Sequence, residues 1–518
     1  MAAPAQPDEP GGVRLALNWL HTWFGLLSCL LLLVIFWTGT LAVFDWEIDR
    51  WMKPATRFTA PTEMSIDAFR PVAEASAPGA EFWQVQFATD RAPAEFYAQL
   101  NDGAHFYRTI GPDGLTLLPD QGTYGGTQFF YPYHFTLNIG FANIGLILCA
   151  FAGIMMMVLC VSGVIIHRRI FADFFTFRKS QKSQRSVLDL HNLTGVLALP
   201  FHFVISLSGV ALFSAMYLPT AQEAVFASDP TAFDQNYFSR PAAGEAGQNS
   251  ASLDVMAEEA ARRWDGVWPG HLRIYYPGDA NSYVEARWPL HGSLAARYHS
   301  IWFDAATGDV IAAPQPSAAS AGYAVLWGLH VVQFDHLTIR WLYFLSGLAG
   351  CVLIATGLLF WSQSRRKRHA KTGKKGAEIV AVIAIGGTTG LILATLAFLI
   401  SNRLLPLDME GRATLETWCF HAVWLAAFAH AGVRRGAAWR EQWIAIAIGG
   451  VVAVALNAVT TGDAIPVAIA RGQWGVAGID IMLLLGSFLA IAAAWRMRSS
   501  QVRTREGHAK KFLPAEKS

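Results

Sequence analysis

The chain has 518 residues, of which 53% are hydrophobic and 15% are charged, and its formal net charge is +2. Soluble domains carry roughly 25% charged residues, so the composition excludes an ordinary soluble protein and indicates a polytopic membrane protein. Its five cysteines all lie in apolar stretches without CxxC spacing. Buried thiols are the simplest interpretation, and we expect neither disulfides nor an iron–sulfur centre.

Eight apolar stretches predict membrane spans, because a helical span needs about 20 mostly apolar residues. The first stretch is longer than a signal-peptide core and is therefore expected to be retained. We expect an α-helical polytopic membrane protein of about eight spans. The stretches are about Leu15–Phe44, Asn143–Ile166, Asp189–Tyr217, Leu337–Trp361, Ile379–Ile400, Trp418–Ala431, Trp443–Thr460 and Trp474–Trp495.

Basic residues predict the orientation of these spans. The loops that follow the second, fourth, sixth and eighth spans are rich in arginine and lysine, and such loops are typically cytoplasmic. Both termini are then cytoplasmic, and two large polar regions lie on the outer side. We interpret the basic cluster after the fourth span as a cytoplasmic anchor, not a nucleic-acid patch. The basic groups are Arg168–Arg185, Arg365–Arg368, Arg434 with Arg435 and Arg440, and Arg496 with Arg498.

The two outer regions each have the pattern of a small α/β module, with one helix followed by short strands and a turn. In the first region we expect a helix at Ser65–Ala75 and strands at Trp83–Ala88, Glu95–Leu100 and His105–Ile110. In the second we expect a helix at Leu253–Trp264 and strands at His271–Tyr276, Ser282–Trp288 and Tyr298–Phe303, then a turn before Val310.

The first four spans repeat a pattern. Leu20-His21 followed by Gly25 recurs as Leu190-His191 followed by Gly195, and a further glycine lies eighteen residues past each histidine, at Gly39 and Gly209. Ser162-Gly163 near the end of the second span recurs as Thr356-Gly357 in the fourth, with His134 and His330 upstream. We therefore expect two copies of span–module–span and four further spans. The predicted segments are 1–44, 45–142, 143–217, 218–320, 321–369, 370–498 and 499–518.

Six histidines lie in or near the repeated spans. His21, His167 and His191 are expected toward the cytoplasmic side, His134 and His330 toward the outer side, and His202 inside the third span. Imidazole is a natural axial ligand of haem iron, and a bundle core can hold a cofactor between helices. Any single histidine could instead be an interfacial anchor. No carboxylate lies beside them within the spans, which argues against zinc or copper.

His191 and His202 are eleven residues apart, which on one straight helix places them on one face about 16 Å apart. They cannot then bind the same iron, so each would serve a different haem, or one would be structural. The pairing of the six ligands stays open at this point.

The motifs Leu190-His191-Asn-Leu-Thr-Gly195, Pro200-Phe201-His202 and Gly163-Val-Ile-Ile-His167-Arg-Arg, with the Leu20-His21 opening, resemble those of the PepSY-associated transmembrane-helix family. The outer modules resemble PepSY domains, and the resemblance covers about Leu15–Trp361. It implies an iron-regulated inner-membrane protein like the ferric-siderophore reductases, which bind two b-type haems. The candidate ligands carried over are His21, His134, His167, His191, His202 and His330.

We therefore expect a haem b oxidoreductase that reduces ferric-siderophore iron in the periplasm. We find no flavin-binding stretch, so the electrons should come from a separate cytoplasmic flavin reductase or from a quinol. One alternative is a non-enzymatic membrane partner or inhibitor of a secreted protein. Another is a transporter component, for which Asp463 and Asp480 in the last spans are thin support.

Overall fold

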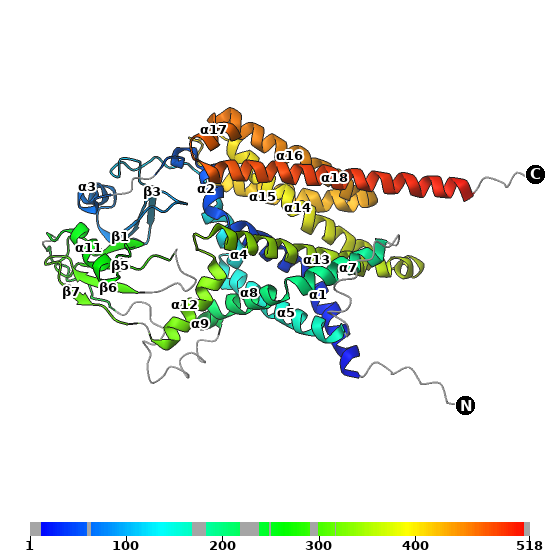
Figure 1. Ribbon diagram of the computed structural model, residues 1–518, viewed down its shortest axis with the longest axis horizontal. Coiled ribbons are helices and arrows are strands. Elements are labelled where there is room, and N and C mark those ends of the chain that lie inside the picture. Colours follow the sequence, from blue (N-terminus) through cyan, green and yellow to red (C-terminus); the bar gives the residue numbers. More distant parts are fainter. Residues whose placement is uncertain are drawn as a thin grey trace, which may run out of the picture. The chain divides into compact units, whose positions relative to one another are not determined.

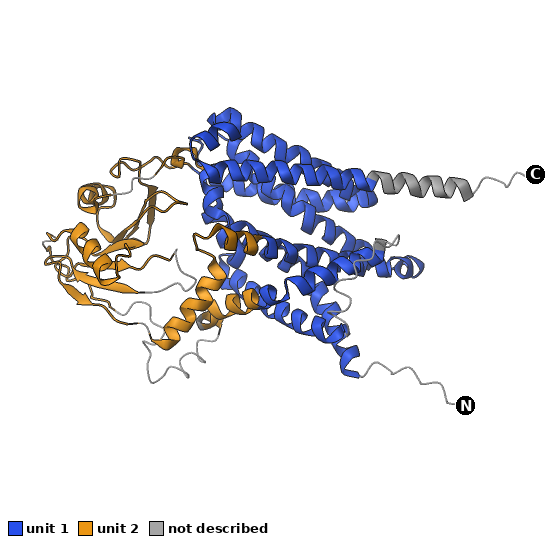
Figure 2. Cartoon of the chain, in the orientation of Figure 1, with its two compact units in different colours: residues 1–52, 122–203, 345–518 blue, residues 53–121, 204–344 orange. Residues whose placement is uncertain are grey.

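The computed structural model describes residues 12–59, 64–167, 183–217, 238–247, 250–290, 299–315 and 317–511. The chain divides into two compact units (Figure 2): a helical unit of residues 1–52, 122–203 and 345–518, and a second unit of residues 53–121 and 204–344, which holds a β-sheet. Most of the expected basic loop after the second span, residues 168–182, lies outside the described residues, as does the stretch 218–237.

Long apolar helices make this a membrane protein. Among the described residues, six helices are long and apolar enough to cross a membrane, or up to seven if one bent pair forms a span. Two of the expected spans fall in a single stretch of 50 residues, interrupted by the turn η5 (Arg435–Ala437), so the count of about eight stays a prediction. The six are α1 (Gly12–Ala42), α5 (Ile144–Ile166), α13 (Leu337–Lys371), α14 (Gly376–Leu404), the stretch of α15 (Arg412–Arg434) with α16 (Ala438–Thr461), and α18 (Trp474–Lys511).

The third expected span is bent, so the straight helix assumed for Asp189–Tyr217 is wrong. α7 (Ser183–Leu197) and α8 (Leu199–Leu212) meet at an angle of 62°. The cause is Pro200 in the first turn of α8, because proline has no N–H and disfavours the helical conformation of the residue before it. His191 and His202 therefore lie on different helical segments, and the one-face separation of about 16 Å expected for a straight helix does not apply.

Of the C-terminal helices, α14 packs against α1 within the helical unit (Figure 1), and α15 and α16 pack against α14. Trp37 of α1 donates from Nε1 to Oγ1 of Thr395 of α14 at 3.0 Å. Gly387 allows the two helices to approach, since a Cβ there would lie 3.0 Å from a methyl carbon of Leu33. Leu391 and Phe398 of α14 are buried in the same core as residues of α1, so α14 and α1 form one packed body.

The two polar regions contribute strands to one antiparallel sheet, in the order β3-β2-β1-β4-β5-β6-β7. The central pairing joins β1 to β4, with Phe82 opposite Tyr275 and Gln86 opposite His271. The expected strands and helices are confirmed within a few residues. The strands are β1 (Ala80–Gln86), β2 (Glu95–Leu100), β3 (His105–Thr109), β4 (His271–Tyr275), β5 (Tyr283–Arg287), β6 (Ser300–Asp304) and β7 (Val310–Ala312).

Two helices, α3 (Ile66–Ser76) and α11 (Leu253–Arg263), pack with the sheet around a single apolar core. Alternation along the strands supplies that core: Trp83 and Val85 of β1 and Ile274 of β4 point into it. One face of the sheet therefore carries both helices.

The two helices cap each other. The carboxylate of Asp67 in α3 accepts from the hydroxyl of Ser252 and from the backbone N–H of Leu253, at the start of α11. Reciprocally, Asp254 of α11 accepts from the hydroxyl of Ser65 at 2.5 Å and from the N–H of Ile66 at 2.6 Å. Each acidic side chain thus satisfies otherwise unpaired N–H groups at the partner helix's N-terminus.

Candidate functional site

A cavity of about 710 Å³ lies among α1, α5, α7, α8 and α13 in the helical unit. Its walls are largely apolar, with Leu32, Met156, Leu159 and Leu353 among the lining residues. Four of the six candidate histidines, His21, His167, His191 and His202, also line it. Cavities lined by apolar side chains with a few polar groups are typical cofactor sites.

His21 and His191 face each other across this cavity. Their ring centroids are 6.5 Å apart and the rings are nearly perpendicular, at 89°. Metal–nitrogen bonds near 2 Å, plus about 1.2 Å from each nitrogen to its ring centre, would separate two axial imidazoles by about 6.4 Å. The spacing therefore fits two ligands on opposite sides of one iron.

The protonation of both rings is set by hydrogen bonds at Nδ1. His191 donates from Nδ1 to the backbone carbonyl of Leu353 at 2.9 Å. His21 Nδ1 lies 3.0 Å from Oγ of Ser162, and that hydroxyl donates its own proton to the carbonyl of Val158, so it accepts from His21. Both rings then carry the lone pair on Nε2, the atom that would bind a metal. Such outer partners typically fix the orientation of histidine ligands.

Glycines let these rings pack against the neighbouring helix. A Cβ on Gly163 of α5 would lie 3.3 Å from Cε1 of His21, and one on Gly357 of α13 would lie 3.1 Å from Cε1 of His191. Contacts this short are tighter than ordinary van der Waals separation, so a larger residue would push either ring out of place.

His134 has the same surroundings within the helical unit. It lies in the short helix α4 (Tyr131–Thr136) and donates from Nδ1 to the carbonyl of Ile35 at 2.8 Å. Its ring is seated on Gly39 of α1, where a Cβ would lie 2.6 Å from Cε1.

His330 repeats the arrangement within the second unit. It lies in α12 (Ala318–Val331), its Nδ1 is 3.1 Å from Oγ of Ser208, and a Cβ on Gly209 would lie 2.6 Å from its Cε1. Ser208 donates its proton to the carbonyl of Val204, so it accepts from the ring. Four of the six candidates thus share one local geometry.

His167 and His202 do not share it. His202 is buried with Nε2 engaged, 3.2 Å from the carbonyl of Ser346, and it packs edge-on against Phe36. His167 follows the last turn of α5, with Nε2 3.3 Å from the side-chain amide of Asn192. In both, Nε2 already has a hydrogen-bond partner, so these two rings suit iron ligation through Nε2 less well than His21 and His191 do.

The cavity contains unsatisfied polar groups. Nδ1 of His167, Nδ1 of His202, Oδ2 of Asp189 and Nε1 of Trp361 are buried without a hydrogen-bond partner within the described parts of the chain, and all four residues line the cavity. Buried polar atoms are almost always bonded, so these atoms indicate a polar occupant or water. Three arginines also line the cavity and could neutralise carboxylates of an occupant: Arg14, Arg185 and Arg365. Together with the histidine pair, this donor set fits a haem.

A hydroxyl residue precedes each of the four glycines; Ser162 and Thr356 entered the predicted repeat, whereas Thr38 and Ser208 were not singled out from the sequence. Thr38, Ser162, Ser208 and Thr356 each donate to the carbonyl four residues earlier. Such back-bonding keeps a small polar residue inside an apolar helix. The sequence signal was available, since each hydroxyl stands directly before its glycine.

The acidic residues considered for transport are held in local pairs. Asp480 accepts from Trp51 Nε1 at 2.7 Å and from Asn457 at 2.9 Å, and Asp463 pairs with Arg471 at 2.5 Å. Within the described residues, no group of three or more His, Cys, Asp or Glu could hold a metal ion by protein ligands alone. The pair of His21 and His191 is therefore the arrangement on which a candidate metal or cofactor site rests.

Comparison with known proteins identifies related chains. Residues 18–364 match the family described as the PepSY-associated TM region. The chain is also similar to an uncharacterized protein, PA4219, of Pseudomonas aeruginosa, with 26% identity over 388 residues. That alignment covers 70% of this chain and 92% of the relative.

Proposed function

Because this chain belongs to the PepSY-associated transmembrane family, we propose that it is a haem b oxidoreductase of the bacterial inner membrane. It passes electrons across the membrane to ferric-siderophore iron in the periplasm, so that the iron is released for uptake. Its electrons come from a cytoplasmic flavin reductase or a quinol. The observation that carries the proposal is the facing pair of His21 and His191, 6.5 Å apart in a cavity of about 710 Å³.

We propose that the first four spans and the two outer modules are two copies of one span–module–span unit. Matching contacts between a histidine ring and a glycine support this. The contact of His21 with Gly163 corresponds to that of His191 with Gly357, and the contact of His134 with Gly39 corresponds to that of His330 with Gly209. His21 and His191 are equivalent positions in the two copies. His134 and His330 are likewise equivalent positions, and each is a candidate haem ligand within its own unit.

The chain's own residues hold and orient the group. His21 and His191 would hold the haem iron, and the hydrogen bonds to Ser162 and to the Leu353 carbonyl keep both rings in position. The glycine seats prevent the rings from being displaced, and the apolar walls exclude water. When bound, a b-type haem supplies an iron that accepts and returns one electron at a time.

The substrate chemistry requires no acid, base or nucleophile from the protein. Ferric iron binds the hard oxygen donors of siderophores strongly, and reduction to the ferrous state weakens that hold. The positive-inside rule predicts that both termini lie in the cytoplasm and both modules in the periplasm. Electrons would thus enter beside the basic loops and leave toward the modules.

The test is the absorption spectrum of the full-length protein purified from haem-replete cells. We expect a b-type spectrum that changes on reduction with dithionite, and a content of two haems per chain. His21→Ala and His191→Ala should each lose about half of the haem, because each removes one of two ligands on one iron. His167→Ala and His202→Ala should lose less haem than these two variants, since Nε2 of each ring has a protein partner and only Nδ1 is left for an occupant.

The matched control is His430→Ala. His430 is a histidine of α15 that bonds to Glu441 at 3.0 Å and does not line the cavity, so its removal should leave the haem content unchanged. A colourless wild-type protein would reject the reductase. It would favour the non-enzymatic partner of a secreted protein, or the transporter component.

A further inference from the structure

The segment of residues 122–136 carries His134, and its backbone is unusual. Gly122 and Gly125 have positive φ angles of 61° and 62°. They lead into a single π-helical turn, η2 (Gly126–Phe130), which continues directly into α4. π-Helical turns are rare and often occur at functional sites. A short helix that follows such a turn needs outside contacts to hold one position.

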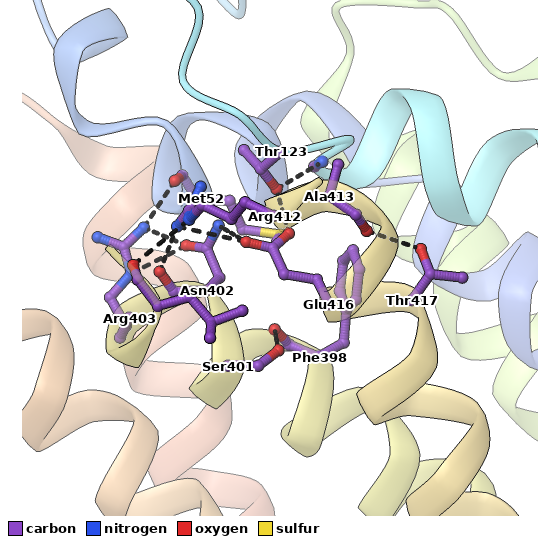
Figure 3. Close-up of polar contacts among 12 residues, drawn as sticks. Met52, Thr123, Phe398, Ser401, Asn402, Arg403, Arg412, Ala413, Glu416 and Thr417 are labelled. Carbon is purple, nitrogen blue, oxygen red and sulfur yellow. Dashed lines mark hydrogen bonds and ion pairs between the residues drawn. The ribbon is translucent and has the colours of Figure 1, made fainter. Parts of the chain in front are cut away.

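The start of the segment is anchored to the helices added after the repeat (Figure 3). Thr123 donates to Oε2 of Glu416 in α15 at 2.5 Å. Glu416 is completely buried, and it also accepts from Asn402 of α14 at 3.0 Å and pairs with Arg412 at 3.3 Å. A buried carboxylate with three partners is a rigid attachment point, because losing Arg412 leaves its charge unpaired and losing Thr123 or Asn402 leaves a buried oxygen without a hydrogen bond.

The middle of the segment is anchored by aromatic packing. Phe129 stacks on Phe398 of α14, with ring centroids 4.3 Å apart and planes 20° apart, and meets Phe420 of α15 edge-on at 5.2 Å. Phe129, Phe398 and Phe420 are each exposed by 1% or less. Buried aromatic pairs contribute about 0.5–1.5 kcal/mol beyond their buried area, so this contact fixes the turn firmly.

The end of the segment is anchored beside the candidate ligand itself. Tyr133, the residue before His134, lies 3.3 Å through its hydroxyl from Nε2 of His421 in α15. His421 donates from Nδ1 to the carbonyl of Thr417 at 2.8 Å, so its Nε2 accepts the tyrosine proton. The tyrosine ring also packs against Phe420.

We propose that α14 and α15 position His134, through the anchors Glu416, Phe398 and His421, and that this is a function of the helices added after the repeat. The inference rests on the proposed function, in which His134 is a haem ligand. Each anchor acts through residues 122–136, so each is a positioning residue and not a ligand.

The experiment measures haem release from the full-length protein to a haem-free globin scavenger. We compare Phe398→Leu and His421→Leu with the matched controls Phe428→Leu and His430→Leu, which change the same residue types on α15, away from the segment. Removing support of a metal ligand typically weakens binding 10–100-fold. We expect the anchor variants to release one of two haems about tenfold faster and the controls to match the wild type.

The identity of the haem that is released faster distinguishes a loss of His134 positioning from a general destabilisation of the protein. The fast-released haem should be the one that is missing from His134→Ala, and the haem lost in His21→Ala should keep its release rate. His421→Gln, which retains an acceptor for Tyr133, should restore slow release. Tyr133→Phe removes only the hydroxyl, keeps the ring packing, and provides the same test if His421→Leu does not fold.

Two results would overturn the inference: equal acceleration of both haems in the anchor variants, or acceleration of neither. A wild-type protein without haem is a different result, because it would reject the proposed function and this inference together. A wild type with two haems and unaltered release in all anchor variants would reject only the inference.

Discussion

Gly39 is the position where a single methyl group should do most damage to the proposed site. A Cβ there would lie 2.6 Å from Cε1 and 2.7 Å from Nδ1 of His134. Ordinary contacts begin near 3.4 Å, so the ring must move by about 0.8 Å. That displacement stretches the 2.8 Å hydrogen bond from Nδ1 of His134 to the Ile35 carbonyl beyond hydrogen-bonding distance, or it rotates the ring out of its present orientation.

The magnitude follows from packing costs. Overpacking a tight interior typically costs about 1–3 kcal/mol, so Gly39→Ala should weaken binding of one haem roughly 5–150-fold, at about 1.4 kcal/mol per factor of ten. Gly163→Ala should do less, because a Cβ at Gly163 would already lie 3.3 Å from His21 and the ring needs to give only slightly. The helix itself gains about 1 kcal/mol from either substitution.

The assay is haem content per chain and haem release for both variants, beside Gly478→Ala. Gly478 lies in α18, and a Cβ there would meet no atom within 4 Å, so this control gains the same helix propensity without a clash. Equal haem retention by Gly39→Ala and Gly478→Ala would refute the view that the glycine seats hold the histidines.

Three further outcomes are expected. Burial and the charge of Arg287 lower the pKa of His271 to about 3. Near pH 6.5 the unfolded side chain binds a proton and the folded one does not, so the sheet should lose stability as the pH falls from about 6.5 toward 3. His271→Gln should reduce this loss, measured by hydrogen exchange of the β4 amides. Reporters fused after Arg368 should read cytoplasmic and those at Asp113 and Gly308 periplasmic; a cytoplasmic reading at either module would contradict the electron path. A deletion strain should import ferric siderophore normally but free its iron slowly, and normal release with every siderophore tested would count against the reductase.

Local patterns predicted the local structure well. The short alternating runs became strands with nearly the expected ends, and the helix at Leu253 began one residue after its cap Ser252. The Leu-His and distant-glycine spacing led to residues that meet in space, because spacing along a helix determines which side chains share a face.

Long-range arrangement was harder to predict. Pro200 can be read from the sequence, but the 62° angle between α7 and α8 depends on how the rest of the chain packs around them. The pairing of His21 with His191 needed coordinates, since a repeat says which positions are equivalent and not which of them meet. The same holds for Glu416, whose partner Thr123 is 293 residues away.

The junction of β1 and β4 has a consequence for biosynthesis. The two strands at the centre of the sheet are nearly 190 residues apart, with the second and third predicted spans between them. During translation, β1 (Ala80–Gln86) is made long before its neighbour β4 (His271–Tyr275), so β1 is at first an unpaired edge of the first module. Unpaired edges recruit other chains. The intervening helices must therefore insert into the membrane as fast as they are translated. Slow insertion should produce aggregates that form on β1 before β4 is available to pair with it.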